Sequence, residues 1–248
     1  MSGHSKWATI RRKKAANDAK RGQLFTKLGR AITIAARDGG GDQETNFKLR
    51  LAIQKARDNN MPLGNIERAI QRGAGGGDGV VYEEIIYEGY GPGGVAMLIQ
   101  STTDNRRRTV AEVRSTLTRA GGSLGATGCV AWQFDQKGVI VLDAKGRDPE
   151  ELALLAIDAG AEDVDYDEEQ VEVRTDLATF QAVQDALEGD VPIVSAELSM
   201  VPKIVLGLAD TEALRSMRLM EQLEELDDVQ TVFTNLDISD ELIAQMAA

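Results

Sequence analysis

The sequence contains one cysteine, Cys129, and one histidine, His4, among 248 residues. Cys129 has no second cysteine with which to form an internal disulfide, which favours a reducing, cytoplasmic location. With one histidine and one cysteine, a Ser–His–Asp or Cys–His triad is hard to build, and so is a Cys/His zinc site. The sequence therefore predicts a protein without a catalytic site, a bound metal or a cofactor.

Long apolar runs are also missing. No stretch approaches the roughly 18 consecutive apolar residues that a membrane helix needs. The first residues, MSGHSKWATIRRKK, carry charge with no apolar run behind it, which argues against a secretory signal peptide. We therefore expect no membrane partner.

The charge of the chain is distributed unevenly. The formal net charge is −12. Residues 1–72 nevertheless hold 16 Lys/Arg and 6 Asp/Glu, a balance of +10, whereas residues 73–248 have a balance of −22. A basic segment joined to an acidic body suggests a polyanionic partner for one end only. A random excess of solvated lysines is the alternative.

Residues 1–78 are predicted to form a basic helical domain. Apolar residues from Leu24 to Ala35 recur at helical spacing, and Gly39–Gly41 ends that helix. A second helix begins at Phe47 and is interrupted before Pro62, which suits the first turn of a third helix that Gly73 closes. The glycine-rich residues 75–79 then form a linker and a domain boundary.

The remainder is predicted to be α+β, with two ferredoxin-like modules, one inserted in the other. Residues 79–135 give the order ββαβ, the last strand being Cys129–Phe134. Residues 136–202 give the complete βαββαβ order of a ferredoxin-like module. Residues 203–248 add the missing helix and strand, so 79–135 plus 203–248 are assigned to one discontinuous domain around the inserted domain 136–202.

Two motifs could suggest enzymatic chemistry. Residues 89–94 fit G-x-G-x-x-G, but a strand rather than a helix follows them, so these glycines are predicted to form a turn and not a dinucleotide site. A run of carboxylates between Asp163 and Glu169 could hold a metal, although a solvated acidic strand edge is the simpler interpretation. A metal-dependent enzyme with an Asp/Glu site between the modules stays as a minor alternative.

The basic N-terminal segment is the main candidate for a nucleic-acid contact. On a helical wheel, Lys20, Lys27, Arg30 and Arg37 fall within an arc of about 100° beside the apolar stripe, and this face could bind a phosphate backbone. Trp7 could stack on an unpaired base, or it could anchor the N-terminal arm to the helix bundle.

Two further basic clusters extend the candidate surface. Arg68 and Arg72 are one helical turn apart, and Arg106–Arg108 open a predicted helix, where cations oppose the helix dipole. The three arginines could contact phosphate, or they could form internal salt bridges with the acidic body. The complete set of candidate nucleic-acid-binding residues is Lys6, Trp7, Arg11, Arg12, Lys13, Lys14, Lys20, Arg21, Lys27, Arg30, Arg68, Arg72, Arg106, Arg107 and Arg108.

Several segments resemble the YebC family. They are residues 3–7 (GHSKW), 15–22 (AANDAKRG), 25–28 (FTKL), 65–70 (NIERAI), 87–94 (YEGYGPGG), 103–106 (TDNR) with 112–114 (EVR), and 237–241 (DISDE). The resemblance implies a three-domain α+β protein that acts as a DNA-binding transcriptional regulator in the bacterial cytoplasm. Relatives in mitochondria are translational activators of cytochrome c oxidase subunit I, and bacterial members are described as ribosome-associated factors that relieve stalling. Leu63 and Gly64 stand where the family has a more polar pair.

The leading hypothesis is therefore a non-enzymatic regulator of gene expression that binds nucleic acid. Its target could be duplex DNA or structured RNA, including ribosomal RNA on the ribosome. A protein-interaction module whose basic end docks an acidic partner is the contrasting hypothesis. Nuclease treatment would abolish binding only if nucleic acid is the partner.

Overall fold

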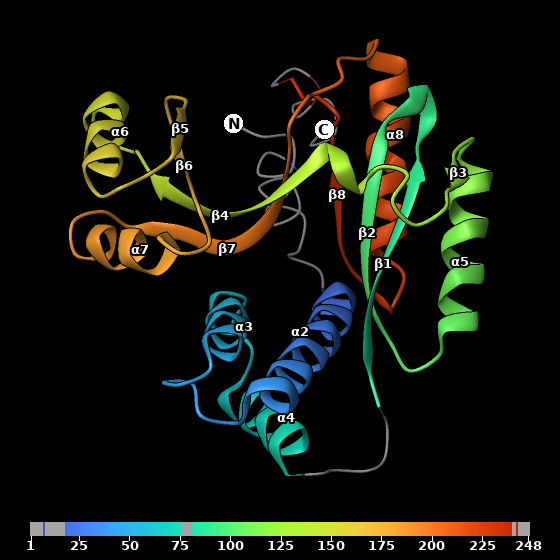
Figure 1. The fold of residues 1–248 in the computed structure, drawn as a ribbon, viewed down its shortest axis with the longest axis horizontal. Coiled ribbons are helices and arrows are strands. Elements are labelled where there is room, and N and C mark those ends of the chain that lie inside the picture. Colours follow the sequence, from blue (N-terminus) through green and yellow to red (C-terminus); the bar gives the residue numbers. More distant parts are fainter. Residues whose placement is uncertain (1–6, 8–17, 76–80, 240–241, 243–248) are drawn as a thin grey trace.

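The computed structural model describes Trp7 and residues 18–75, 81–239 and 242. The chain folds into a helical domain followed by two α/β modules, each with its own four-stranded sheet (Figure 1). The predicted α+β class, with a helical N-terminal part, is confirmed.

The helical domain consists of α2 (Asp18–Gly39), α3 (Phe47–Asp58) and α4 (Leu63–Ala74). The three predicted helices are present. Asn46 connects the first two, because its side chain accepts a hydrogen bond from the amide of Leu49 and donates to the carbonyl of Ala35. Gly73 allows α4 to approach α2 closely, since a Cβ at this position would lie 2.2 Å from the carbonyl oxygen of Thr33.

The middle module contains β1 (Glu83–Tyr90), β2 (Ala96–Thr103), α5 (Arg106–Arg119) and β3 (Ser123–Leu124), and the C-terminal α8 (Asp210–Glu224) and β8 (Val229–Thr234). Its antiparallel sheet has the order β3-β1-β2-β8, so the C-terminal segment completes it as expected. Helices α5 and α8 pack on one face of the sheet through Val113, Leu117, Met217 and Leu223. The helices and strands follow one another as ββαβαβ, a different chain order from that of the inserted module.

The glycine-rich segment at residues 89–94 connects β1 to β2, as predicted. Pro92–Gly94 form a short 3₁₀ turn (η1). Gly93 has φ 71°, and a Cβ there would lie 2.6 Å from the side chain of Leu208. Its left-handed backbone conformation therefore favours glycine, and a larger residue would also displace the side chain of Leu208.

The expectation of a strand at Cys129–Phe134 is wrong. Residues Ala131–Gln133 form a 3₁₀ turn (η2), and the third strand of this sheet is the short β3. The cause is Glu88, whose buried carboxylate accepts hydrogen bonds from the amides of Gly128, Val130 and Ala131 at 2.6–2.8 Å. These amides are satisfied by a side chain, so they do not enter a strand ladder.

The inserted module contains β4 (Phe134–Asp143), α6 (Pro149–Asp158), β5 (Asp163–Tyr166), β6 (Gln170–Thr175), α7 (Phe180–Glu188) and β7 (Ile193–Pro202). The predicted βαββαβ order is confirmed, and the antiparallel sheet has the order β5-β6-β4-β7. The first and last strands are neighbours, and their pairing extends to Phe134 opposite Pro202. The chain therefore enters and leaves the module at one place, which is what an insertion requires.

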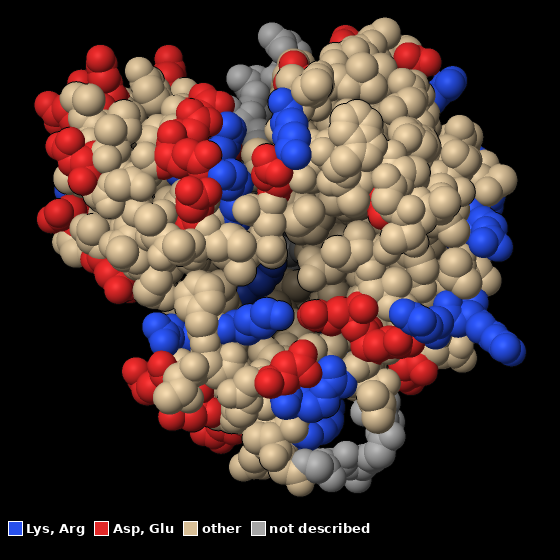
Figure 2. All heavy atoms as spheres, viewed as in Figure 1, with Lys and Arg blue, Asp and Glu red and all other residues tan. Residues whose placement is uncertain are grey.

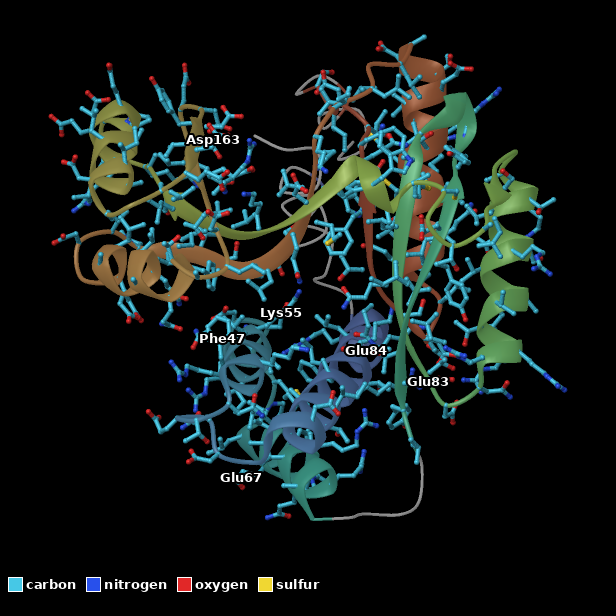
Figure 3. The ribbon with its side chains drawn as sticks, viewed as in Figure 1. Phe47, Lys55, Glu67, Glu83, Glu84 and Asp163 are labelled. Carbon is cyan, nitrogen blue, oxygen red and sulfur yellow. The ribbon has the colours of Figure 1, made fainter. Side chains whose placement is uncertain are left out.

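The helical domain touches both α/β modules (Figure 1). One end of α2 lies near the end of α8, while α3 lies below the sheet of the inserted module. The rings of Phe47 and Phe180 meet edge to face at 6.1 Å, and the Nζ of Lys55 lies 2.7 Å from a carboxylate oxygen of Glu197. In Figure 3, Phe47 and Lys55 are labelled on the side of α3 that faces this module.

Candidate nucleic-acid interface

Five of the fifteen candidate residues lie outside the part of the chain that the structure describes. They are Lys6, Arg11, Arg12, Lys13 and Lys14. Lys20 lies in α2, but its side chain is not among those described. Residues 1–17 hold five Lys/Arg and no Asp/Glu, so half of the basic excess of residues 1–72 belongs to this segment.

Trp7 is not available to stack on a base. Its side chain is 2% exposed and belongs to the hydrophobic core of the middle module, together with residues of α5, α8 and β8. Its indole Nε1 donates a hydrogen bond of 2.9 Å to a carboxylate oxygen of Glu224. Trp7 is therefore an anchor. The sequence suggested that it would pack against the helix bundle, but in the structure it packs into the middle module.

The basic face of α2 contacts the middle module. The Nζ of Lys27 donates to the carbonyl oxygen of Glu224, and Arg30 lies 3.0 Å from a carboxylate oxygen of Asp228. Arg37, further along the helix, donates to a backbone carbonyl in the segment before β1. This face was expected to bind phosphate; in the structure it forms an interface between domains, so Lys27 and Arg30 leave the candidate interface.

Asp228 is the acidic centre of that interface. Its side chain is 2% exposed and accepts hydrogen bonds from Thr103 at 3.0 Å, Thr109 at 2.7 Å and Arg108 at 2.7 Å, in addition to Arg30. Burial raises the pKa of Asp228, but the hydrogen bonds from Arg108, Thr109 and Thr103 outweigh it and hold the pKa below its usual range. One carboxylate thus joins α2, β2, α5 and the connection between α8 and β8.

The three arginines that open α5 have different roles. Arg108 pairs with Asp228 and with Asp104 at 2.7 Å, and Arg106 lies 3.0 Å from Glu83 on β1, which Figure 3 labels. Arg107 is exposed and has no ion pair within the described residues. Internal salt bridges therefore account for Arg106 and Arg108, and Arg107 stays available to a ligand.

The other candidate arginines are exposed on α2 and α4. Arg68 donates to the carbonyl of Gly64 within its own helix, and Arg72 has no ion pair among the described residues. The guanidinium of Arg21 lies 5.9 Å from the ring centre of Phe25. Together with Arg107, these side chains lie on three helices, α2, α4 and α5.

Basic and acidic side chains are distributed unevenly over the molecular surface. Figure 2 shows Lys/Arg and Asp/Glu side chains interleaved over the helical domain, while acidic side chains dominate the inserted module. Over α5, at the right-hand edge of this view, basic side chains predominate. The acidic body therefore contains a local basic region.

The carboxylate run of the inserted module surrounds an arginine. Arg174 lies 2.6 Å from Asp163, 2.8 Å from Glu172 and 3.9 Å from Asp165. Its guanidinium occupies the position that a cation would take between these carboxylates. Within the described ranges, no three His, Cys, Asp or Glu side chains are grouped closely enough to hold a metal ion.

None of the helices in the described part of the chain is both long and apolar enough to cross a membrane.

Sequence reasoning overlooked two groups. One is the pair of acceptor carboxylates, Asp228 and Glu88, whose partners lie far away in the sequence. The other is a set of arginines, Arg119, Arg215 and Arg218, that line a groove between α5 and α8. The spacing of Arg215 and Arg218, which places them on one helix face, was the only signal for the groove in the sequence.

The geometry defines a class of α+β protein in which a basic helical domain is fastened to an acidic pair of α/β modules. Residues 5–76 match the family model described as the TACO1/YebC protein N-terminal domain, and residues 82–236 match the TACO1/YebC second and third domain. The chain belongs to the TACO1/YebC family, which confirms the resemblance found in the sequence.

Relatives and a solved structure agree with this assignment. A protein of Chloroflexus aggregans is 58% identical over 98% of both chains, and one of Geobacter sulfurreducens is 56% identical over 97% of this chain and 98% of its own length. Each is named a probable transcriptional regulatory protein. The crystal structure of a conserved hypothetical protein from Aquifex aeolicus is similar with a TM-score of 0.83 and 47% identity, covering 90% of this chain and 93% of that one.

Proposed function

We propose that this protein is a non-enzymatic regulator of gene expression that binds nucleic acid through its basic N-terminal domain. The observation that carries the proposal is the charge division, +10 over residues 1–72 against −22 over the rest. Phosphate contacts by Lys and Arg supply most of the affinity in such complexes. The names of the relatives support a role in transcription.

The structure narrows the surface on which this proposal depends. Lys27, Arg30, Arg106 and Arg108 have internal partners. The remaining candidates are the basic residues of 1–17 and the exposed Arg21, Arg68, Arg72 and Arg107. Trp7 itself is buried in the middle module and hydrogen-bonded to Glu224 of α8.

The chemistry of the described reactive side chains supports the non-enzymatic part of the proposal. The one histidine lies near the N-terminus, and Cys129 is only partly exposed with a pKa that burial raises further above its usual value. A thiol of raised pKa is a poor nucleophile. The carboxylates nearest to a metal-site arrangement are paired with Arg174.

The test is the salt dependence of binding by the full chain. Because Trp7 packs into the middle module, the isolated helical domain would lack its anchor. Binding to a duplex DNA and to a structured RNA should weaken linearly on a log–log salt plot, with a slope of about −0.9 per phosphate contact on B-form DNA. Lys13→Ala with Lys14→Ala should reduce that slope by nearly two contacts.

The matched control is Lys145→Ala with Arg147→Ala, which removes the same charge from the exposed surface of the inserted module. It should leave the slope unchanged. A salt-independent affinity of the parent protein would refute the phosphate model. Tighter binding to the RNA than to the duplex at equal salt would direct the proposal to translation rather than transcription.

A further inference from the structure

A groove of about 580 Å³ lies between α5 and α8 on the middle module. It is lined on one side by the last turn of α5 and on the other by the middle and end of α8. The polar side chains that line it are Thr116, Arg119, Arg215, Arg218, Gln222 and Glu225.

The arginines of this groove form no ion pair with a described residue. No carboxylate in the described part of the chain lies within 4.0 Å of the guanidinium of Arg119, Arg215 or Arg218. The single hydrogen bond recorded for Arg119 is one of 3.5 Å to the hydroxyl of Thr116. Elsewhere in the same acidic body, Arg108 and Arg174 each contact more than one carboxylate. The groove arginines are thus not used to neutralise the body.

Helix α5 carries further exposed arginines outside the groove. Arg107 and Arg114 are exposed on this helix and have no ion pair within the described residues. At 1.5 Å per residue, Arg107 and Arg119 are about 18 Å apart along the helix axis. The helix carries five arginines and one glutamate, and basic side chains predominate along it in Figure 2. At 100° per residue, Arg107 and Arg114 lie about 120–140° around the helix from Arg119, so they belong to a separate exposed face of α5. The groove itself is lined by Arg119, Arg215 and Arg218.

The chemistry of the lining favours phosphate. The planar guanidinium offers paired donors that match phosphate oxygens, which is why arginine is common at such sites. Arg215 and Arg218 are three residues apart on α8, so their side chains are neighbours. A protein partner would need an apolar anchor at its centre, but Leu219 is buried and Leu226 is partly buried. Glu225, the one carboxylate of the lining, lies at the end of α8.

We propose that the α5–α8 groove is a second phosphate-binding surface, occupied by the backbone of the nucleic acid that the N-terminal domain binds. The inference rests on the proposed function and extends it, because it assigns binding to a part of the chain whose net charge is −22. The nucleic acid would contact both the basic N-terminal domain and the arginines of the groove, Arg119, Arg215 and Arg218.

The test compares three forms of the full chain on one duplex DNA and one structured RNA. They are the parent, Arg215→Ala with Arg218→Ala, and the control Lys145→Ala with Arg147→Ala. On duplex DNA the groove variant should lose up to about 1.8 units of salt slope and bind on the order of tenfold more weakly at 0.1 M salt, since it lacks two phosphate contacts. Because both side chains are exposed, its thermal midpoint should match that of the control.

A charge-preserving variant separates charge from geometry. Arg215→Lys with Arg218→Lys should restore most of the slope, while its affinity stays below that of the parent because lysine lacks the planar fork. Equal slopes and affinities for the groove variant and the control would overturn the groove proposal and leave the proposed function intact. No salt-dependent binding by the parent would overturn the proposed function itself. Unchanged nucleic-acid binding together with a lost affinity for a polyglutamate peptide would assign the groove to an acidic protein and also overturn the proposal.

Discussion

Replacement of Asp228 by asparagine should destabilise the protein strongly. One carboxylate oxygen accepts a hydrogen bond from Arg30, and the other accepts from Arg108, Thr103 and Thr109. An asparagine has one acceptor oxygen and one NH₂ group. Its NH₂ group would therefore point at hydrogen-bond donors in place of one carboxylate oxygen. Two arginines would also lose their buried counter-charge. The substitution keeps the size of the side chain and therefore tests the charge and the hydrogen bonds rather than the packing.

The magnitude follows from the burial of the partners. Removing one member of a buried ion pair typically costs about 3–5 kcal/mol. Asp228 is 2% exposed, but the Arg108 side chain is 42% exposed and can regain contact with water. We therefore expect the free energy of unfolding to fall by an amount near the lower end of this range, about 3 kcal/mol. For a chain of this size that corresponds to a fall of roughly 6–12 °C in the thermal midpoint.

The pH dependence gives an independent check. Because the pKa of Asp228 is lowered in the folded protein, its contribution to stability is present above the unfolded pKa of about 3.9 and is lost as the pH falls through the folded value. Urea unfolding at pH 7 should show the full difference between parent and Asp228→Asn. The difference should shrink below about pH 4.

The neighbouring residue supplies the control. Asp227 is exposed, and its carboxylate accepts one long hydrogen bond, 3.4 Å from Gln23. Asp227→Asn should change the stability by less than about 0.5 kcal/mol. If the two variants unfold at the same urea concentration, or if the loss in Asp228→Asn is the same at pH 7 and at pH 3, the role assigned to Asp228 is wrong.

Three other substitutions test separate parts of the structure. Trp7→Ala should cost about 3–5 kcal/mol by emptying a core position, and it should weaken binding to every nucleic acid together; a selective loss on single strands would instead restore the base-stacking hypothesis. Glu88→Ala should lower stability by about 1–3 kcal/mol, because the buried amide of Val130 and the partly buried amides of Gly128 and Ala131 lose their acceptor. Amide exchange of residues 128–131 should accelerate, and unchanged exchange there would contradict the contact. Arg107→Ala should leave the urea midpoint nearly unchanged whereas Arg108→Ala should lower it, so equal midpoints would argue against the division of roles on α5.

Local patterns in the sequence were sufficient for most of the secondary structure. The three helices of residues 1–78 and the βαββαβ order of residues 136–202 were predicted and are present, because alternation, capping and turn residues act over short distances. The glycine-rich turn at residues 89–94 was recognised as a turn because a strand follows it. The nesting of one module in the other could be inferred from the order of elements alone.

The segment at Cys129–Phe134 shows where local patterns fail. Its apolar residues are typical of a strand, but its amides bind the carboxylate of Glu88, forty residues earlier in the chain. No local pattern indicates that a distant acceptor will replace a neighbouring strand as a hydrogen-bond partner.

The candidate interface shows the same limit for function. The sequence by itself determined the charge division, the amphipathic character of α2 and the family to which the chain belongs. Only the tertiary structure decided which charges stay exposed. Arg30 and Arg108 meet one buried carboxylate, Trp7 enters the core of another module, and Arg215 and Arg218 line a groove without an ion pair to any described residue. The physical reason is that a helical pattern records which residues share a face, whereas domain packing determines whether that face meets water, an internal carboxylate or a ligand.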